Sequence, residues 1–346
     1  MATEPPPEAV SLPSPPTDGI TALSYLPGQP TLLASTSFDG AVRIHDTNER
    51  KFVLSQTMES GPLLSLATPK GLNALVTGGL DGTVRMFDIA ATQYQVIGRH
   101  TAEDPKLMGC SSLGALAASG GSNAPLIASA GWNSQFHLWD VRQSSSSAAA
   151  TIQLPGKAFS MDVDPANQNR VVIATAGRRI CVIDVRAGGD ASLVLDRESS
   201  LKFQSRAVRF FPDGNGIALG SIEGRVAVEF LEELGLQAKM KKYAFKCHRQ
   251  GDTVYPVNCI AFHPQYGTFA TGGCDGYVST WDGLHKKKLT TLPQFSTSIA
   301  ALAFNHDGSE LAIAPSYTYE DGEREHPRDE IFIRRMLDSE CQPKTK

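Results

Sequence analysis

The amino-acid sequence predicts an all-β protein folded as a seven-bladed β-propeller, and two observations lead to this prediction. One pattern recurs along the chain: an apolar strand, a tight turn, and a second strand that ends close to an aromatic-Asp pair. Its turn residues lie 42 to 52 residues apart, between Asp39 and Asp275. Seven short apolar runs are also spaced through the chain, one for each expected blade. Units of about 40–45 residues, each with four strands, are typical of propellers.

The clearest copy of the pattern is FATGGCDGYVSTWD, residues 269–282. Its Asp275-Gly276 pair stands between two β-rich runs, which is a strong signal for a tight hairpin. Four similar copies and one degenerate copy surround it; they span 32–46, 75–88, 127–140, 171–186 and 217–230.

The ends of these copies relate the chain to a known repeat. Trp139-Asp140 and Trp281-Asp282 close two units, while Phe87-Asp88 and His45-Asp46 are weaker forms of the same ending. On these residues the chain resembles the WD-repeat β-propellers.

Each blade should begin with an inner strand, and near-continuous apolar runs suggest strands buried on both faces. The seven candidates span 20–27, 62–69, 113–119, 157–164, 206–212, 257–264 and 299–306. Val10 to Leu12 is a further short strand, which we expect to close the last blade, because closure removes exposed sheet edges. We therefore expect a disordered tail over 1–8, a single propeller over 9–340, and a C-terminal tail over 341–346.

Composition excludes several classes of protein. The chain has 41% apolar and 20% charged residues, without the run of about 18 apolar residues that a membrane span needs. Its net charge of −4 argues against general nucleic-acid binding. The six cysteines are scattered without a Cys-x-x-Cys pair, which favours free thiols in the nucleus or cytoplasm.

No motif of an enzyme is present, so we expect no catalytic residue, metal or cofactor. The chain lacks a phosphate-binding Gly-rich loop, a nucleophile elbow and a His-Glu-x-x-His motif. Among the histidines, His248 is the strongest candidate for a catalytic role. The WD-repeat resemblance instead implies a structural hydrogen-bond network of His248, Thr271, Asp275 and Trp281. His100 is placed for a similar role, although Asn133 stands there in place of the turn aspartate.

A basic block covers residues 197–249, with ten Lys/Arg and six acidic residues in a chain that is acidic overall. On the propeller prediction, Arg206 begins an inner strand, Arg225 follows a hairpin turn, and Lys246 precedes the next blade. These three positions lie on one rim of the ring, so we expect the cations to converge there.

Converging cations suit an acidic or phosphorylated peptide, since a phosphate carries nearly two charges and several acceptor oxygens. Such a site needs a groove, because exposed ion pairs contribute only about 0–1 kcal/mol each. The alternative is a scatter of solvated charges. Phe38 and Trp132, each just before a turn, are either interface anchors or half-buried packing residues.

The phrases RESSLKFQSR, SIEGRVAVEF and KKYAFKCHR, followed by YPVNCIAFHP and EHPRDEIFIR, carry a closer resemblance. They resemble the mitotic spindle-checkpoint propellers of the "budding uninhibited by benzimidazoles" family, over residues 9–340. The resemblance implies a non-enzymatic adaptor of the nucleus, of the mitotic kinetochore and also of the cytoplasm. Its implied partners are checkpoint kinases with a Gle-two-binding-sequence segment, kinetochore scaffold motifs of Met-Glu-Leu-Thr type once phosphorylated, and a ubiquitin-ligase-binding checkpoint complex.

The same resemblance implies the site residues. Arg225, Lys246 and Phe38 correspond to phosphopeptide-binding positions, and Trp132, Arg206 and Arg178 to the surface for the partner segment. Phe38 departs from the family pattern, because the family usually has tryptophan at this position. The phenylalanine ring is smaller and lacks the indole N–H, so it cannot donate a hydrogen bond.

Two alternatives stay open. The sister family, a WD-repeat messenger-RNA export factor at the nuclear pore, shares the SIEGRVA phrase and the same class of partner segment. A propeller enzyme or a substrate receptor for a ubiquitin ligase is a different class of function. The enzyme would need clustered acids or metal ligands in the channel, and the sequence offers none.

Overall fold

The computed structural model describes residues 7–58, 61–117, 125–142, 147–167, 169–185, 190–231 and 242–344. The predicted N-terminal tail therefore lies almost wholly outside the described residues, as do parts of the 111–125 insertion and of the Ser-rich stretch at 144–147.

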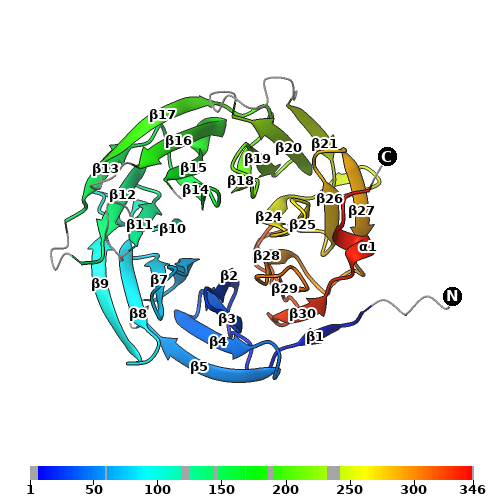
Figure 1. The fold of residues 1–346 in the computed structure, drawn as a ribbon, viewed down its shortest axis with the longest axis horizontal. Helices are drawn as coiled ribbons and strands as arrows, with labels where there is room; N and C mark the ends of the chain where they lie inside the picture. Colours follow the sequence, from blue (N-terminus) through cyan, green and yellow to red (C-terminus); the bar gives the residue numbers. More distant parts are fainter. Residues whose placement is uncertain are drawn as a thin grey trace.

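The described chain forms seven four-stranded antiparallel sheets, set like blades around a central channel (Figure 1). The all-β, seven-bladed prediction is confirmed. In the first three blades the strands, from the channel outward, are β2 (Ile20–Leu26), β3 (Gln29–Ser37), β4 (Ala41–Asp46) and β5 (Lys51–Thr57); β6 (Leu63–Ala67), β7 (Ala74–Gly79), β8 (Thr83–Asp88) and β9 (Gln93–Arg99); β10 (Ser112–Leu116), β11 (Leu126–Ala130), β12 (Gln135–Asp140) and β13 (Ala150–Gln153).

The next three blades follow in the same order around the ring. Their strands are β14 (Ala158–Val163), β15 (Arg170–Thr175), β16 (Arg179–Val185) and β17 (Ala191–Glu198); β18 (Ser205–Phe210), β19 (Gly216–Ser221), β20 (Arg225–Phe230) and β21 (Tyr243–Lys246); β24 (Val257–Phe262), β25 (Phe269–Gly273), β26 (Val278–Asp282) and β27 (Lys287–Thr291). Two short elements join neighbouring blades: η1 (Pro105–Leu107) and the hairpin of β22 (Arg249–Gln250) and β23 (Thr253–Val254). A third, η2 (Ala176–Arg178), forms the turn between β15 and β16 within the fourth blade.

The seventh blade is built from both ends of the chain. It consists of β28 (Ile299–Phe304), β29 (Glu310–Pro315), β30 (Phe332–Arg335) and β1 (Ala9–Ser11). Val10 faces Ile333 in the β1–β30 ladder, and the Leu12 amide donates to the Ile331 carbonyl at 2.8 Å. The predicted N-terminal strand thus closes the ring, as Figure 1 shows.

Burial differs between the two innermost strands of each blade. All seven predicted inner strands are present, but the expectation that they are buried on both faces is wrong: β6 alternates between buried and half-buried residues. The second strands, such as β7, β11 and β19, are buried throughout. The inner strand has one edge against the channel, whereas the second strand is covered by neighbouring blades and by strands on both sides.

The sequence predicts that the C-terminal tail begins at residue 341, but the structure holds residues 341 and 342 in place. A short helix, α1 (Asp338–Cys341), ends at Cys341, whose side chain is buried. Thr268 Oγ1 donates to the Cys341 carbonyl at 2.7 Å, and Gln342 Nε2 donates to the Tyr266 hydroxyl at 3.1 Å. These bonds fix residues 341 and 342 against the sixth blade.

Two further predictions concern the whole chain. All six cysteines are free and buried, and burial raises the pKa of the Cys259 thiol to about 12. Among the described residues, no helix is long and apolar enough to cross a membrane.

Candidate functional site

The turns between second and third strands lie on one rim of the ring, together with the links between blades; we call this the turn rim. A repeated backbone bond builds it, because the residue just before each turn donates to a carbonyl before the inner strand. Phe38 donates to Gly19 at 2.9 Å, and Trp132 donates to Gly109 at 2.9 Å. The propeller repeat therefore presents equivalent side chains around one opening of the channel.

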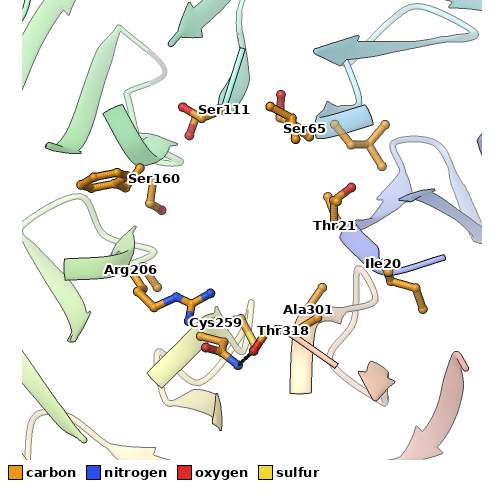
Figure 2. A pocket seen from close by; sticks show the side chains of 18 of the residues that line it. Ile20, Thr21, Ser65, Ser111, Ser160, Arg206, Cys259, Ala301 and Thr318 are labelled. Carbon is orange, nitrogen blue, oxygen red and sulfur yellow. Dashed lines mark hydrogen bonds between the residues drawn. The ribbon is translucent and has the colours of Figure 1, made fainter. Parts of the chain in front are cut away.

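Inside the turn rim, the channel widens into a cavity of about 690 Å³ (Figure 2). Phe38, Trp132, Ile222 and Tyr319 lie along it, and Arg206 extends into it from the start of β18. The first, third, fifth and seventh blades each contribute one of the four apolar or aromatic side chains. The cavity is a concave, mixed aromatic and cationic surface, which is typical of a binding site.

Several of these apolar side chains are unusually exposed. Phe38 is 37% exposed, Ile222 38% and Tyr319 47%. Large apolar residues gathered at one opening favour a surface that a partner covers. Our sequence analysis missed Ile222 and Tyr319, although Ile222 occupies the same pre-turn position in SIEG as Phe38 does in the first blade.

Trp132 rests on the link that precedes its own blade. A side chain at Gly109 would come within 2.7 Å of the Trp132 ring, so only glycine allows this close approach. The ring is half-buried and its remaining surface faces the cavity. Trp132 therefore fits both predicted roles: it packs against the chain at Gly109, and part of its ring stays accessible as an interface anchor.

The basic residues of the fifth blade form a row across one end of its sheet. Ser205 faces Ser221, Ser221 faces Arg225, and Arg225 faces Lys246 in the strand ladders. Arg206 is the bulged residue next to Ser205. The row therefore runs from the channel to the outer edge, with Arg225 and Lys246 on neighbouring strands about 4.8 Å apart.

Arg225 and Lys246 are accessible to a ligand. Arg225 is 34% exposed and has only a weak ion pair, 3.5 Å from its Nε to Glu223. Lys246 is exposed. Arg206 stands two strands from Arg225, roughly 10 Å away at this spacing, so it serves a separate part of any ligand.

The structure places two other predicted residues differently. Phe38 lies in the first blade beside the cavity, together with Trp132 and Arg206, and not beside Arg225 and Lys246. Arg178 is in the turn of the fourth blade, where it donates to the Leu201 carbonyl at 3.2 Å and pairs with Glu198 at 3.3 Å. Its guanidinium is therefore already occupied.

The four residues of the predicted structural network meet in the sixth blade. His248 bonds Asp275 through Nδ1 and Thr271 through Nε2, both at 2.8 Å, and Trp281 Nε1 donates to Thr271 Oγ1 at 2.9 Å. His248, Thr271 and Asp275 are buried, so the imidazole has no access to a substrate. This arrangement supports the turn and offers no catalytic group.

The third blade repeats this network with a neutral turn residue. His100 bonds Ser129 at 2.8 Å and Asn133 at 3.1 Å, and Trp139 donates to Ser129 at 2.8 Å. Burial, with the neighbouring His137, lowers the pKa of His100 to about 4. The histidine is therefore neutral at physiological pH, in keeping with an amide partner.

The first two blades stabilise their turns in another way, which our sequence analysis missed. Arg43 pairs with Asp39 at 2.7 Å and Arg85 with Asp81 at 2.8 Å. Burial by itself would raise the pKa of each aspartate, but hydrogen bonds from the arginine and from nearby hydroxyl groups outweigh it and lower both pKa values. The spacing Asp-Gly-x-Val-Arg, common to both copies, is the signal that predicts these pairs.

No group of three or more His, Cys, Asp or Glu residues within the described ranges is arranged to hold a metal ion. The turn rim presents aromatic and basic side chains around one opening of the channel.

Comparison with known proteins agrees with this geometry. The profile of the family described as "WD domain, G-beta repeat" matches residues 9–46 and 240–282. "Mitotic checkpoint protein bub3" of Dictyostelium discoideum is 40% identical over 343 residues, which cover 97% of each chain. The chain belongs to the Bub3 family of mitotic checkpoint proteins. "Mitotic checkpoint protein BUB3.1" of Arabidopsis thaliana is 39% identical, over 100% of this chain and 98% of the relative.

Export factors are more distant relatives of this Bub3-family chain. The "Poly(A)+ RNA export protein" of Schizosaccharomyces pombe is 33% identical, over 90% of this chain and 85% of the relative. This identity is lower than that of the Bub3 relatives, in agreement with the assignment to the Bub3 family.

Proposed function

We propose that this Bub3-family chain is a non-enzymatic adaptor of the spindle assembly checkpoint. It binds phosphorylated kinetochore scaffold motifs of Met-Glu-Leu-Thr type at Arg225 and Lys246. It recruits checkpoint kinases whose Gle-two-binding-sequence segment lies on the turn rim. The observation that carries this proposal is the direct pairing of Arg225 with Lys246 across β20 and β21, in a chain of this family.

The Arg225–Lys246 pair fits a phosphorylated threonine. Two cations on neighbouring strands can approach different oxygens of one phosphate group, and a charge-assisted hydrogen bond contributes about 1.5–3 kcal/mol when it is partly desolvated. Because Lys246 is exposed and Arg225 is about one-third exposed, solvent screening reduces these values. The phosphate contributes only part of the affinity, and the flanking residues of the motif supply the rest.

The cavity and its aromatic edge fit the partner segment. Phe38, Trp132, Ile222 and Tyr319 offer apolar surface for anchor residues, and Arg206 offers a cation for an acidic side chain. Aromatic anchors near the centre of an interface usually carry most of its binding energy. We place Phe38 with this group because it lines the same cavity as Trp132.

The proposed partners set the cellular location. The chain would work at kinetochores during mitosis, would otherwise reside in the nucleus and cytoplasm, and would enter a ubiquitin-ligase-binding checkpoint complex through the kinase-type partner. Neither membrane nor nucleic acid is a proposed partner.

The direct test is a binding titration with paired Met-Glu-Leu-Thr peptides, phosphorylated and unphosphorylated, at two salt concentrations. We expect at least about tenfold tighter binding of the phosphorylated peptide at low salt, and a smaller preference at high salt, because exposed charges are screened. Equal affinity for the two peptides would contradict the phosphate site.

A second test addresses the partner segment. Trp132→Ala should weaken binding of a Gle-two-binding-sequence peptide at least about tenfold, measured by calorimetry, since it removes a large anchor ring. Leu80→Ala is the matched control, because Leu80 is exposed at the equivalent position in the second blade but does not line the cavity. Equal losses for the two variants would remove Trp132 from the site.

The export-factor function is the second candidate, supported by the 33% identity to the fission-yeast export protein. It uses the same class of partner segment but needs no phosphothreonine site. Tight segment binding without phosphopeptide binding would therefore favour it.

A further inference from the structure

The link between the fourth and fifth blades, residues 199–204, lies beside Arg225 of the proposed phosphopeptide site. The Lys202 amide donates to Glu223 Oε1 at 3.2 Å. The other oxygen of the same carboxylate, Oε2, lies 3.5 Å from Arg225 Nε. One carboxylate therefore joins this link to the arginine that we assign to the phosphate.

Arg225 and Lys246 face the side of the fifth-blade sheet from which this link comes. Arg225 stands two residues before Ala227 in β20, and side chains two apart on a strand share one face of the sheet. Ala227 and Leu201 of the link belong to the same buried cluster. Lys246 is paired with Arg225 across the ladder, so its side chain shares this face.

Phe203, in the middle of the link, exposes an aromatic ring at this place. It is 53% exposed, the highest value among the large apolar residues that the structure describes. The next residue, Gln204, is fixed, because its carbonyl accepts from the Ile222 amide at 3.0 Å. Phe203 does not line the central cavity, so it lies outside the surface proposed for the partner segment. Exposed aromatic rings are frequent anchors of interfaces.

Lys202 brings a third cation to the same place. Its side chain is exposed and forms no hydrogen bond or ion pair within the described ranges. With Arg225 and Lys246 there are three cations, and the carboxylate of Glu223 leaves two positive charges in balance. A phosphothreonine carries about −1.5 to −2 at pH 7, so the charges are complementary.

The buried carboxylate of Glu229 holds the link in place. Its Oε1 accepts from the Ser200 amide at 2.9 Å and from the Ser200 hydroxyl at 2.5 Å. The Glu229 side chain is 1% exposed and also pairs with Arg197. Leu201, the next residue, is buried. The backbone that carries Phe203 is thus ordered before a ligand arrives, which lowers the entropy cost of binding.

We infer that the 199–204 link is one wall of the phosphopeptide site. Phe203 contacts the apolar methionine and leucine of the Met-Glu-Leu-Thr motif, and Lys202 adds a cation to the surroundings of the phosphate. The inference rests on the proposed function, and it names the two side chains that supply affinity besides Arg225 and Lys246. An aromatic ring suits this role, because it offers a large apolar surface.

A double-mutant cycle tests the contact of Phe203 with the peptide. Phe203→Ala in the full chain should weaken binding of the phosphorylated Met-Glu-Leu-Thr peptide at least about fivefold, measured by calorimetry. With a phosphorylated Ala-Glu-Ala-Thr peptide, the same variant should lose less than about twofold, because the apolar partners are already absent. Its affinity for the Gle-two-binding-sequence peptide should be unchanged, and circular dichroism checks the fold.

Lys202→Met tests the third cation. We expect about a two- to fivefold loss of phosphopeptide affinity at low salt and a smaller loss at high salt, because the lysine is exposed and salt screens its charge. The chain offers a matched control, since Lys51-Phe52 repeats the Lys-Phe pair on β5 of the first blade. Phe52 is 40% exposed, and the Lys51 side chain is 70% exposed. Lys51→Met and Phe52→Ala should leave the affinity unchanged.

The outcomes separate this inference from the proposed function. If the parent chain prefers the phosphorylated peptide but Phe203→Ala binds it equally well, the inference fails and the proposed function stands. Equal losses of Phe203→Ala with both peptides, or with the Gle-two-binding-sequence peptide, would show an effect on the fold of the rim and overturn the contact. The same loss in Phe52→Ala would also overturn it. A parent chain without any preference for phosphate would overturn the proposed function and this inference together.

Discussion

Arg225→Glu is expected to abolish phosphopeptide binding, with at least about a hundredfold loss of affinity. The change removes one charge-assisted hydrogen bond of about 1.5–3 kcal/mol and places a negative charge beside the phosphate. It also adds a second carboxylate next to Glu223, which lies 3.5 Å from Arg225 in the native chain. Calorimetry or fluorescence anisotropy with the phosphorylated Met-Glu-Leu-Thr peptide measures the loss.

Arg99→Glu is the matched control for this experiment. Arg99 ends the outer strand of the second blade and faces Thr83, as Lys246 ends the outer strand of the fifth blade and faces Arg225. Arg99→Glu makes the same change in net charge at the exposed position of the second blade that corresponds to Lys246, outside the proposed site, so it should leave the affinity nearly unchanged. Unaltered phosphopeptide binding in Arg225→Glu, or an equal loss in both variants, would discard the fifth-blade site.

Thr271→Val is expected to cause the largest loss of stability, about 2–5 kcal/mol. The Thr271 hydroxyl links His248 and Trp281 in a buried network, and valine has nearly the same shape but cannot form either bond. One acceptor on His248 and one donor on Trp281 would then be unpaired, at about 1–3 kcal/mol each. Urea unfolding followed by circular dichroism measures the change in the free energy of unfolding.

Ser129→Ala makes a comparison within the same protein. Ser129 joins His100 and Trp139 in the third blade as Thr271 joins its partners in the sixth. The two networks share no residue, so the losses in a double variant should add within about 0.5 kcal/mol. A Thr271→Val protein as stable as the parent would show that the network does not stabilise the turn.

The positions of residues that the repeat fixes could be predicted from the sequence. Phe38 and Arg225 occupy fixed positions relative to an Asp-Gly or Glu-Gly turn, and Trp132 precedes the equivalent Asn133-Ser134 turn, so their place on the turn rim follows once the blades are aligned. The direct pairing of Arg225 with Lys246 does not follow in this way, because a long stretch of chain separates β20 from β21 and the register between third and fourth strands shifts in several blades.

Features that depend on contacts between distant segments could not be predicted. Whether Arg206 projects into the channel depends on a bulge in β18. Arg178 appeared free for a partner because Glu198 and Leu201, which bind it, are 20 or more residues away. Cys341 appeared to belong to a tail because its contacts with Thr268 lie in another blade.

The three-residue strand β1 has a consequence for how the protein is made. Since Ala9–Ser11 pairs only with β30, near the other end of the chain, the seventh blade stays incomplete until synthesis has passed Arg335. Throughout translation the exposed edge of the unfinished ring is a template for mispairing with other nascent chains. We therefore expect newly made chains to need chaperone protection until the ring has closed, and a ribosome that stalls before β30 should yield an aggregation-prone product.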